Sequence, residues 1–111
     1  LAEMITKAGG VIYDSEGFLK DLSSWNEEIA VLAASKENIK LGAEHWDIIY
    51  LLRKFYNEHQ VAPANRALVN LVKRELDLTK GKSAYLMKLF GGSPAILASK
   101  IAGLPKPDNC F

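Results

Sequence analysis

The chain has 111 residues, of which 49% are hydrophobic and 24% are charged, a composition typical of one globular domain with a modest core. Its single cysteine excludes an internal disulfide framework and suggests a reducing compartment. No apolar run approaches the roughly 18 residues that a membrane-spanning helix needs, so we expect a cytoplasmic protein. The net charge is −4 over residues 1–60 and +5 over residues 61–111, which makes the second half compatible with an acidic partner or RNA phosphates.

The first predicted element is a small β-hairpin. Residues 10–13 and 18–19 are short β-prone runs on either side of Asp14-Ser15-Glu16-Gly17, and Gly17 can supply a positive φ in the turn. Because a hairpin of this size is not stable alone, we expect it to lie against the helices that follow.

The first helical pattern follows Ser24, which stands three residues before Glu27 with the spacing of a capping box. It predicts a helix over residues 25–36, which Asn38 ends. The residues expected on its buried face are Trp25, Ile29, Leu32 and Ala33.

Four more helices are predicted along the rest of the chain. The longest periodic segment predicts a core helix over residues 43–59, and shorter patterns predict helices over 63–76 and 94–101, the last ended by Gly103. Between these two, Ser83 is expected to cap a short helix that carries Tyr85, Leu86, Leu89 and Phe90. The apolar stripe of the longest helix comprises Trp46, Ile49, Leu52, Phe55 and Tyr56, and it is widened by Ile48 and Leu51. The residues expected to begin or cap the later helices are Pro63, Ser83, Ser93 and Pro94.

These elements predict a mostly α protein, a compact orthogonal bundle of about five helices with a small N-terminal β-hairpin, formed by residues 1–103. Residues 104–111 are expected to form an extended, mobile C-terminal arm, because Pro105 and Pro107 lack backbone donors and disfavour helical dihedrals in the residues before them. The arm carries Cys110, whose α-carbon can lie roughly 23 Å from that of Gly103 at about 3.3 Å per residue. The alternative is a passive chain end with a chemically silent thiol.

Few side chains are candidates for chemistry. His45 and His59 are fourteen residues apart, near opposite ends of one predicted helix, so a shared metal site is not expected, and the sequence indicates no cofactor. No nucleotide-binding loop or hydrolase elbow occurs. The remaining candidate is Cys110, since a nucleophilic thiolate can accept a terminal sulfur as a persulfide and expose it to a second protein.

Three basic side chains, Lys106, Lys100 and Arg66, could stabilise that thiolate if the arm folds back. Asp108 and the terminal carboxylate would oppose them. The sequence does not determine the sign of the net effect on the thiol.

The C-terminal part of the chain resembles the signature of the DsrC/TusE family. The resemblance rests on Gly91-Gly92-Ser93-Pro94 and on the string from Lys100 to Pro107 that leads to the penultimate Cys110. It continues through residues 14–19, 44–46, 63–66 and 85–90, and so covers nearly the whole chain. The family implies a helical domain with a β-hairpin and a mobile arm whose penultimate cysteine handles sulfur.

One departure separates the branches of that family. DsrC proteins of dissimilatory sulfite reduction carry a second cysteine eleven positions before the penultimate one, where this chain has Ser99. The chain therefore resembles the single-cysteine, TusE-like branch. That branch implies a sulfurtransferase that takes a persulfide from a TusBCD-type complex and passes it on, with an MnmA-type thiouridylase, for 2-thiolation of transfer RNA.

Two alternatives remain open at the level of the sequence. One is a DsrC-like accessory, or gamma, subunit of a sulfite reductase. The other is a helix-turn-helix-like nucleic-acid-binding module, in which the helices over 43–59 and 63–76 would turn Arg66, Lys73 and Arg74 toward phosphates.

Overall fold

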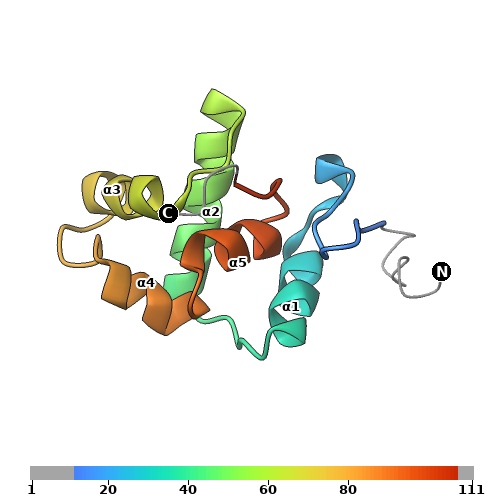
Figure 1. Ribbon diagram of the computed structural model, residues 1–111, viewed down its shortest axis with the longest axis horizontal. Coiled ribbons are helices and arrows are strands. Elements are labelled where there is room, and N and C mark those ends of the chain that lie inside the picture. The colour runs from blue at the N-terminus through green and yellow to red at the C-terminus, as the bar shows by residue number, and fades with distance from the viewer. Residues whose placement is uncertain (1–11, 108–111) are drawn as a thin grey trace.

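Helices make up most of the protein, for which a computed structural model describes residues 12–107 (Figure 1). The short 3-10 helix η2 (Leu22–Ser24) comes first. The α-helices are α1 (Glu27–Lys36), α2 (Ala43–His59), α3 (Asn65–Glu75), α4 (Ser83–Phe90) and α5 (Pro94–Ile101). This order confirms the predicted five-helix architecture, and the bounds of the helices over 43–59 and 94–101 agree with prediction.

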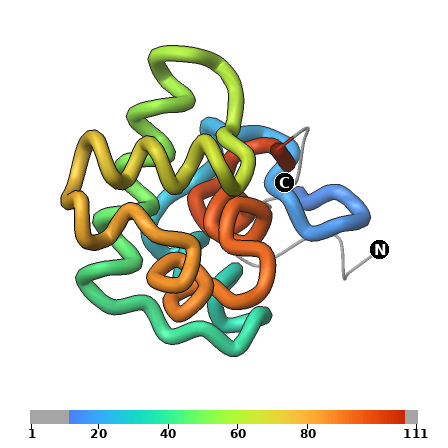
Figure 2. The backbone as a smooth tube through the Cα atoms, turned by 60° about the vertical axis from the view of Figure 1, so that its left-hand side comes forward, coloured from blue at the N-terminus to red at the C-terminus, as the bar shows by residue number. Residues whose placement is uncertain are grey.

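Helix α5 lies at the centre of the bundle and contacts each of the other four α-helices. Figures 1 and 2 show it enclosed from two directions, with α1 on one side and α3 and α4 on the other. Its inward positions include Ala95 and Ala98, which expose none of their surface. Because small side chains let helix backbones approach closely, a helix of only eight residues can touch four neighbours.

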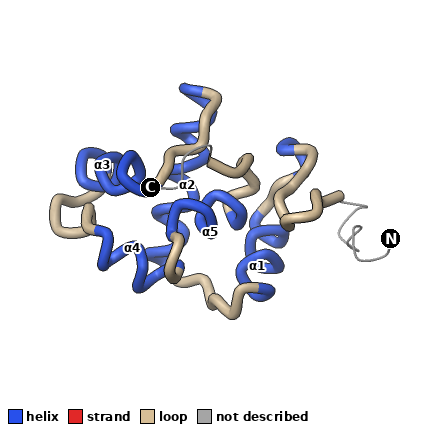
Figure 3. Tube along the Cα trace, in the orientation of Figure 1, coloured by secondary structure: helices blue, strands red, loops and turns tan. Residues whose placement is uncertain are grey.

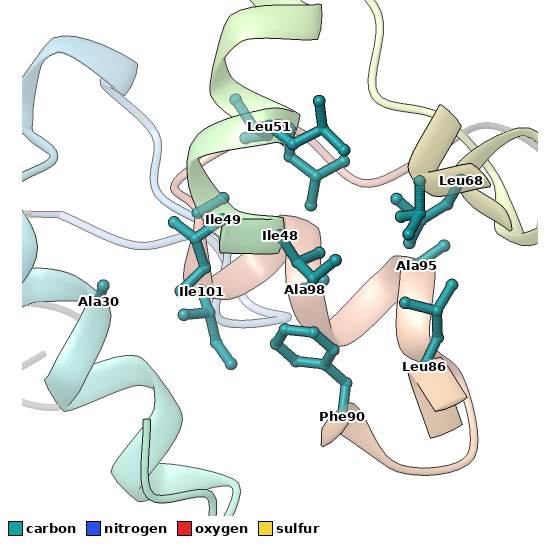
Figure 4. Packing of buried hydrophobic residues seen from close by; sticks show 14 of the residues in the cluster. Ala30, Ile48, Ile49, Leu51, Leu68, Leu86, Phe90, Ala95, Ala98 and Ile101 are labelled. Atoms are coloured by element: carbon teal, nitrogen blue, oxygen red, sulfur yellow. The ribbon is translucent and has the colours of Figure 1, made fainter. Parts of the chain in front are cut away.

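Helix α2 supplies much of the core, as its apolar stripe predicts. Ile48, Ile49 and Leu52 are fully buried, and Figure 4 shows Ile48 near Phe90 of α4 and Ala98 of α5. Burying side chains of this size contributes about 1.5–3 kcal/mol each. Within residues 12–107, no helix is both long and apolar enough to cross a membrane.

The start of α1 differs from the predicted capping box. The N-cap is Asn26, whose Oδ1 accepts the Ile29 N–H at 2.9 Å, whereas Ser24 lies in η2. Helix α1 turns its alanines, rather than Leu32, toward α5: Ala30 and Ala34 are fully buried, and Leu32 is 43% exposed. The prediction for Leu32 was wrong because the small residues allow the closer approach.

The predicted N-terminal β-hairpin was also wrong, since residues 12–107 contain no strand (Figure 3). A turn closed by one isolated antiparallel bridge, between Tyr13 and Leu19, occupies its place. Asp14 Oδ1 accepts the backbone N–H groups of Glu16 and Phe18, both at 2.9 Å. The chain then enters η2 at Leu22, with only Asp21 between it and Lys20, so too few residues remain to extend the bridge into strands. Residues 10 and 11 of the predicted hairpin lie outside the described part.

Two further helix starts differ from prediction by one or two residues. Helix α3 begins at Asn65, two residues after Pro63, and α4 begins at Ser83, which follows the N-cap instead of being one. Helix α5 begins as predicted, with Ser93 at the N-cap and Pro94 first. The Ser93 side chain makes no capping bond; Asn65 Oδ1 accepts the Ala95 N–H at 2.8 Å instead. The side chain at the start of α3 thus caps α5.

Candidate functional site: the base of the C-terminal arm

The C-terminal arm begins at a tightly closed helix end. Gly103 has a φ of +75°, its N–H donates to the Lys100 carbonyl at 3.2 Å, and the Leu104 N–H donates to the Ser99 carbonyl at 2.9 Å. This pair of bonds is the Schellman motif, which requires a left-handed residue after the helix. A Cβ atom at position 103 would also overlap the Trp25 ring. Gly103 is therefore required both for its conformation and for the space that it leaves.

Two side chains from elsewhere in the fold hold the last carbonyl groups before Gly103. Trp25 Nε1 donates to the Ile101 carbonyl at 2.9 Å, and Arg53 Nη1 donates to the Ala102 carbonyl at 2.6 Å. The Arg53 guanidinium carbon lies 4.0 Å from the centroid of the Trp25 ring. Burial lowers the pKa of the Arg53 guanidinium, an effect that Tyr50 partly offsets, but arginine remains charged at physiological pH.

The 14–18 turn lies against this helix end from the other side. Lys106 Nζ lies 3.3 Å from Glu16 Oε2, and Lys100 Nζ lies 5.2 Å from the centroid of the Phe18 ring. Figure 2 shows the C-terminal segment, in red, beside this turn, in blue. Lys100 Nζ also lies 3.4 Å from Glu37 Oε2 on α1, and its side chain is only 17% exposed.

The structure brings two of the three predicted basic residues together. Lys100 and Lys106 meet at the 14–18 turn, and each is paired with a carboxylate. Arg66 is exposed in the first turn of α3, which contacts α5. Cys110 and Asp108 lie outside the described residues, so a role for these cations in stabilising the thiolate stays a prediction.

The first arm residues are partly enclosed. Leu104 is 2% exposed and Pro107 is buried, while Pro105 and Lys106 are exposed. A hollow of about 220 Å³ lies where Pro105 and Lys106 pass the end of α2 and the loop that follows it. The first arm residues therefore run along the surface of the body, beside the end of α2, instead of projecting directly from the end of α5.

The two histidines have separate surroundings. His45 Nδ1 accepts the Gly42 N–H at 3.0 Å, so its proton is on Nε2, which lies 2.9 Å from the Leu89 carbonyl. His59 is exposed at the other end of α2, with its ring 4.4 Å from that of Phe55. In the part of the chain that the structure describes, no group of three His, Cys, Asp or Glu side chains could hold a metal ion.

Sequence reasoning missed Arg53 and placed Trp25 inside a helix. A signal for Arg53 was present, because it follows Leu52 and stands four residues after Ile49, on the apolar stripe of α2. A single cation on the buried face of a core helix indicates a specific partner. The partner, a carbonyl 49 residues away in sequence, could not be identified without the fold.

Comparisons with known proteins give one consistent family. The model of the family described as "DsrC like protein" matches residues 6–111. The sulfurtransferase TusE of Salmonella paratyphi A is 47% identical over 98 residues, which are 88% of this chain and 90% of that protein. This chain belongs to the DsrC-like family. The family and the sulfurtransferase class predicted from sequence are both confirmed by these relatives.

Further members of the DsrC-like family agree in sequence and fold. TusE of Escherichia coli is 46% identical, with the same 88% and 90% coverage. The NMR structure of Allochromatium vinosum DsrC has a TM-score of 0.87 and 42% identity, covering 96% of both chains. The oxidized gamma-subunit of the dissimilatory sulfite reductase (DsrC) of Archaeoglobus fulgidus has a TM-score of 0.74 and 39% identity, covering 91% of this chain and 92% of that one.

Ser99, the position at which the sequence resemblance distinguishes a single-cysteine from a two-cysteine branch, lies in the core. Ser99, on α5, exposes none of its surface, and its Oγ has no hydrogen-bond partner within residues 12–107. A hydroxyl cannot form a disulfide, so Ser99 cannot be bonded to Cys110 in the way that a second thiol at this position could.

One of the three cations that the nucleic-acid alternative requires is paired with a carboxylate in the structure. Of the cations that it invoked, Arg74 has its Nε 3.2 Å from Glu75 Oε2. The remaining two, Arg66 and Lys73, are both exposed on α3. A neutralised cation favours phosphate binding less than a free one does.

Proposed function

We propose that this protein carries sulfur as a persulfide on Cys110 and passes it on for 2-thiolation of transfer RNA. The observation that carries the proposal is the match to TusE sulfurtransferases over 88% of the chain at 47% identity. The family model also extends over residues 6–111 and so includes Cys110, the single thiol. One thiol is sufficient for a relay, whereas an internal disulfide needs two.

The loading step exchanges one sulfur–sulfur bond for another. The Cys110 thiolate attacks the terminal sulfur of a donor persulfide, a bond forms between Cys110 Sγ and that sulfur, and the donor leaves as a thiolate when its own bond breaks. In the second step, a thiolate of the acceptor attacks the same terminal sulfur and releases Cys110 as a thiolate. The number of sulfur–sulfur bonds is constant, so neither step needs an external oxidant or reductant.

The fold supports a division between a body and a carrying arm. We assign residues 1–103 to the body, with Gly103 closing its last helix, and residues 104–111 to the arm of the same domain. The burial of Leu104 fixes the arm's first residue against the body. Lys106, Lys100 and Arg66 are the cations that we propose to favour the thiolate when the arm lies near them.

The proposed donor is a TusBCD-type complex, and the proposed acceptor is an MnmA-type thiouridylase, with transfer RNA engaged through it in the cytoplasm. A second candidate is an accessory role beside a sulfite reductase, because the Archaeoglobus fulgidus relative is the gamma-subunit of a dissimilatory sulfite reductase. Ser99 favours the first candidate, because the two-thiol version of the second needs a cysteine at that position.

Mass spectrometry of the whole protein after incubation with glutathione persulfide tests the carrier role. We expect one added sulfur on wild type and none on Cys110→Ser. Affinity capture from a cell extract should then recover a thiouridylase or a donor complex with wild type. The carrier role is wrong if the sulfur adduct forms on a residue other than Cys110 or does not form at all.

A further inference from the structure

We propose that Trp25 and Arg53 are positioning residues that set the direction in which the arm leaves the body. Their effect would be to present Cys110 to the proteins that load and unload it. The inference rests on the proposed function, because direction matters only if the arm delivers a reactive group to a second protein. Neither residue would touch the transferred sulfur.

The first argument is the choice of partners. The last carbonyl groups of an α-helix receive no hydrogen bond from an N–H group of the same helix and are commonly bound by water instead. Here the Ile101 and Ala102 carbonyls are held at 2.9 and 2.6 Å by Trp25, which precedes α1, and by Arg53 of α2. These carbonyls belong to the last two residues before Gly103, where the chain turns into the arm.

The second argument is the cost of placing a cation there. Arg53 is half-buried, on the core-facing stripe of α2, where an apolar side chain would pack without loss of hydration. Its guanidinium lies against the Trp25 ring at 4.0 Å, and the Trp25 ring fills the space that the absent Cβ of Gly103 leaves. The three residues therefore form one packed unit whose polar contacts end on the helix terminus.

The third argument is leverage. Eight residue steps lead from Ala102 to Cys110, and fully extended they span roughly 26 Å at about 3.3 Å per residue. Turning a fully extended arm of that length by about 10° at its base would move the tip by up to roughly 5 Å, and a displacement of even about 1 Å can slow a reaction 100-fold. Pro105 and Pro107 stiffen the stretch over which a change in direction is transmitted.

Loading by two donors of different size tests the inference. Rates of persulfide formation on Cys110 are compared for wild type, Arg53→Gln, Arg53→Lys and the control Lys54→Gln, which removes an exposed cation from the same helix. With glutathione persulfide, all four rates should agree within about twofold. With a TusBCD-type protein donor, Arg53→Gln should be at least about tenfold slower in the limit of low donor concentration. Arg53→Lys keeps the charge and a donor group that reaches farther than the glutamine amide, so it should recover part of the loss.

A distance measurement makes the inference independent of sulfur chemistry. Nitroxide labels on Cys110 and on Glu28→Cys, an exposed position of α1, report the distribution of distances between arm and body. The distribution should shift or broaden in Arg53→Gln relative to wild type and Lys54→Gln. If Arg53→Gln does not fold, Trp25→Phe serves instead, because it keeps the ring and removes only the Nε1 donor.

The outcomes separate the two proposals. If wild type is not loaded by either donor, the carrier function fails, and the label distances still decide whether Arg53 directs the arm. If wild type is loaded but folded Arg53→Gln matches it in both protein-donor rate and distance distribution, the positioning role is wrong. A uniform slowing with both donors would also overturn it, because that result points to the thiol itself.

Discussion

At the scale of single residues, Ser99 is the polar side chain that the described core leaves unsatisfied. A buried hydroxyl without a partner loses its hydrogen bonds to water and gains none in the protein, which costs about 1–3 kcal/mol. Ser99→Ala should therefore raise the free energy of unfolding by about 1 kcal/mol relative to the control Ser35→Ala, an exposed serine on α1 that shares the change in helix propensity. Urea denaturation measures both. A loss of stability in Ser99→Ala would show that the hydroxyl has a partner.

Asp77 is a second residue whose surroundings predict a measurable property. Its Oδ1 accepts the Thr79 N–H and hydroxyl, both at 2.7 Å, and these bonds lower the pKa of the carboxyl below its ordinary value of 3.8. The charged form is favoured in the folded state, so its stabilising effect is present above pH 3.8 and is lost as the pH falls through the lower folded value. In Thr79→Val, an NMR titration should show the Asp77 pKa rising toward 3.8. An unchanged value would mean that the hydroxyl bond does not lower it.

At the scale of elements, helix interiors could be predicted from the sequence better than helix starts. The 43–59 helix carries its apolar stripe and its end signals locally, so its bounds agree with the structure. The start of α1 could not be predicted in the same way, because Trp25 is held outside the helix by the Ile101 carbonyl, 76 residues away. The hairpin prediction failed for a related reason, since Asp14 uses its side chain to close the turn and η2 begins soon after.

Capping of α5 by Asn65 is the element-scale contact with the clearest expected effect. Loss of an N-terminal capping acceptor typically costs about 1 kcal/mol. Asn65→Ala should therefore lower the free energy of unfolding by about that amount, and Asn65→Asp, which keeps an acceptor oxygen, should restore most of it. Asn70→Ala, at an exposed position of the same helix, is the matched control. Equal losses of stability in Asn65→Ala and Asn70→Ala would show that the effect comes from α3 itself and that the bond from Asn65 to α5 contributes nothing measurable.

At the scale of the whole molecule, the sequence predicted a body and an arm, but not how the two are joined. The proline-containing segment and the penultimate thiol could be recognised because both are local features. The junction could not, because it combines residues from η2's end, α2 and α5 that are adjacent only in the fold. The burial of Leu104 and Pro107 also shows that packing continues past Gly103, the residue at which the sequence placed the end of the body.

The extent of the packed body can be measured with two truncated chains. Removing residues 108–111 deletes the thiol but leaves Leu104 and the Schellman motif, so the melting temperature should stay within a few degrees of wild type. Removing residues 104–111 also exposes the site of the Leu104 side chain and deletes the bond from its N–H to the Ser99 carbonyl. Burial of a leucine contributes about 1.5–3 kcal/mol and such a bond about 1 kcal/mol, so this chain should melt markedly lower. Both truncations remove Cys110 and should abolish sulfur loading, but only the longer one should also weaken the fold. Equal melting temperatures for the two chains would show that the folded body ends at Gly103 and that residues 104–107 do not stabilise it.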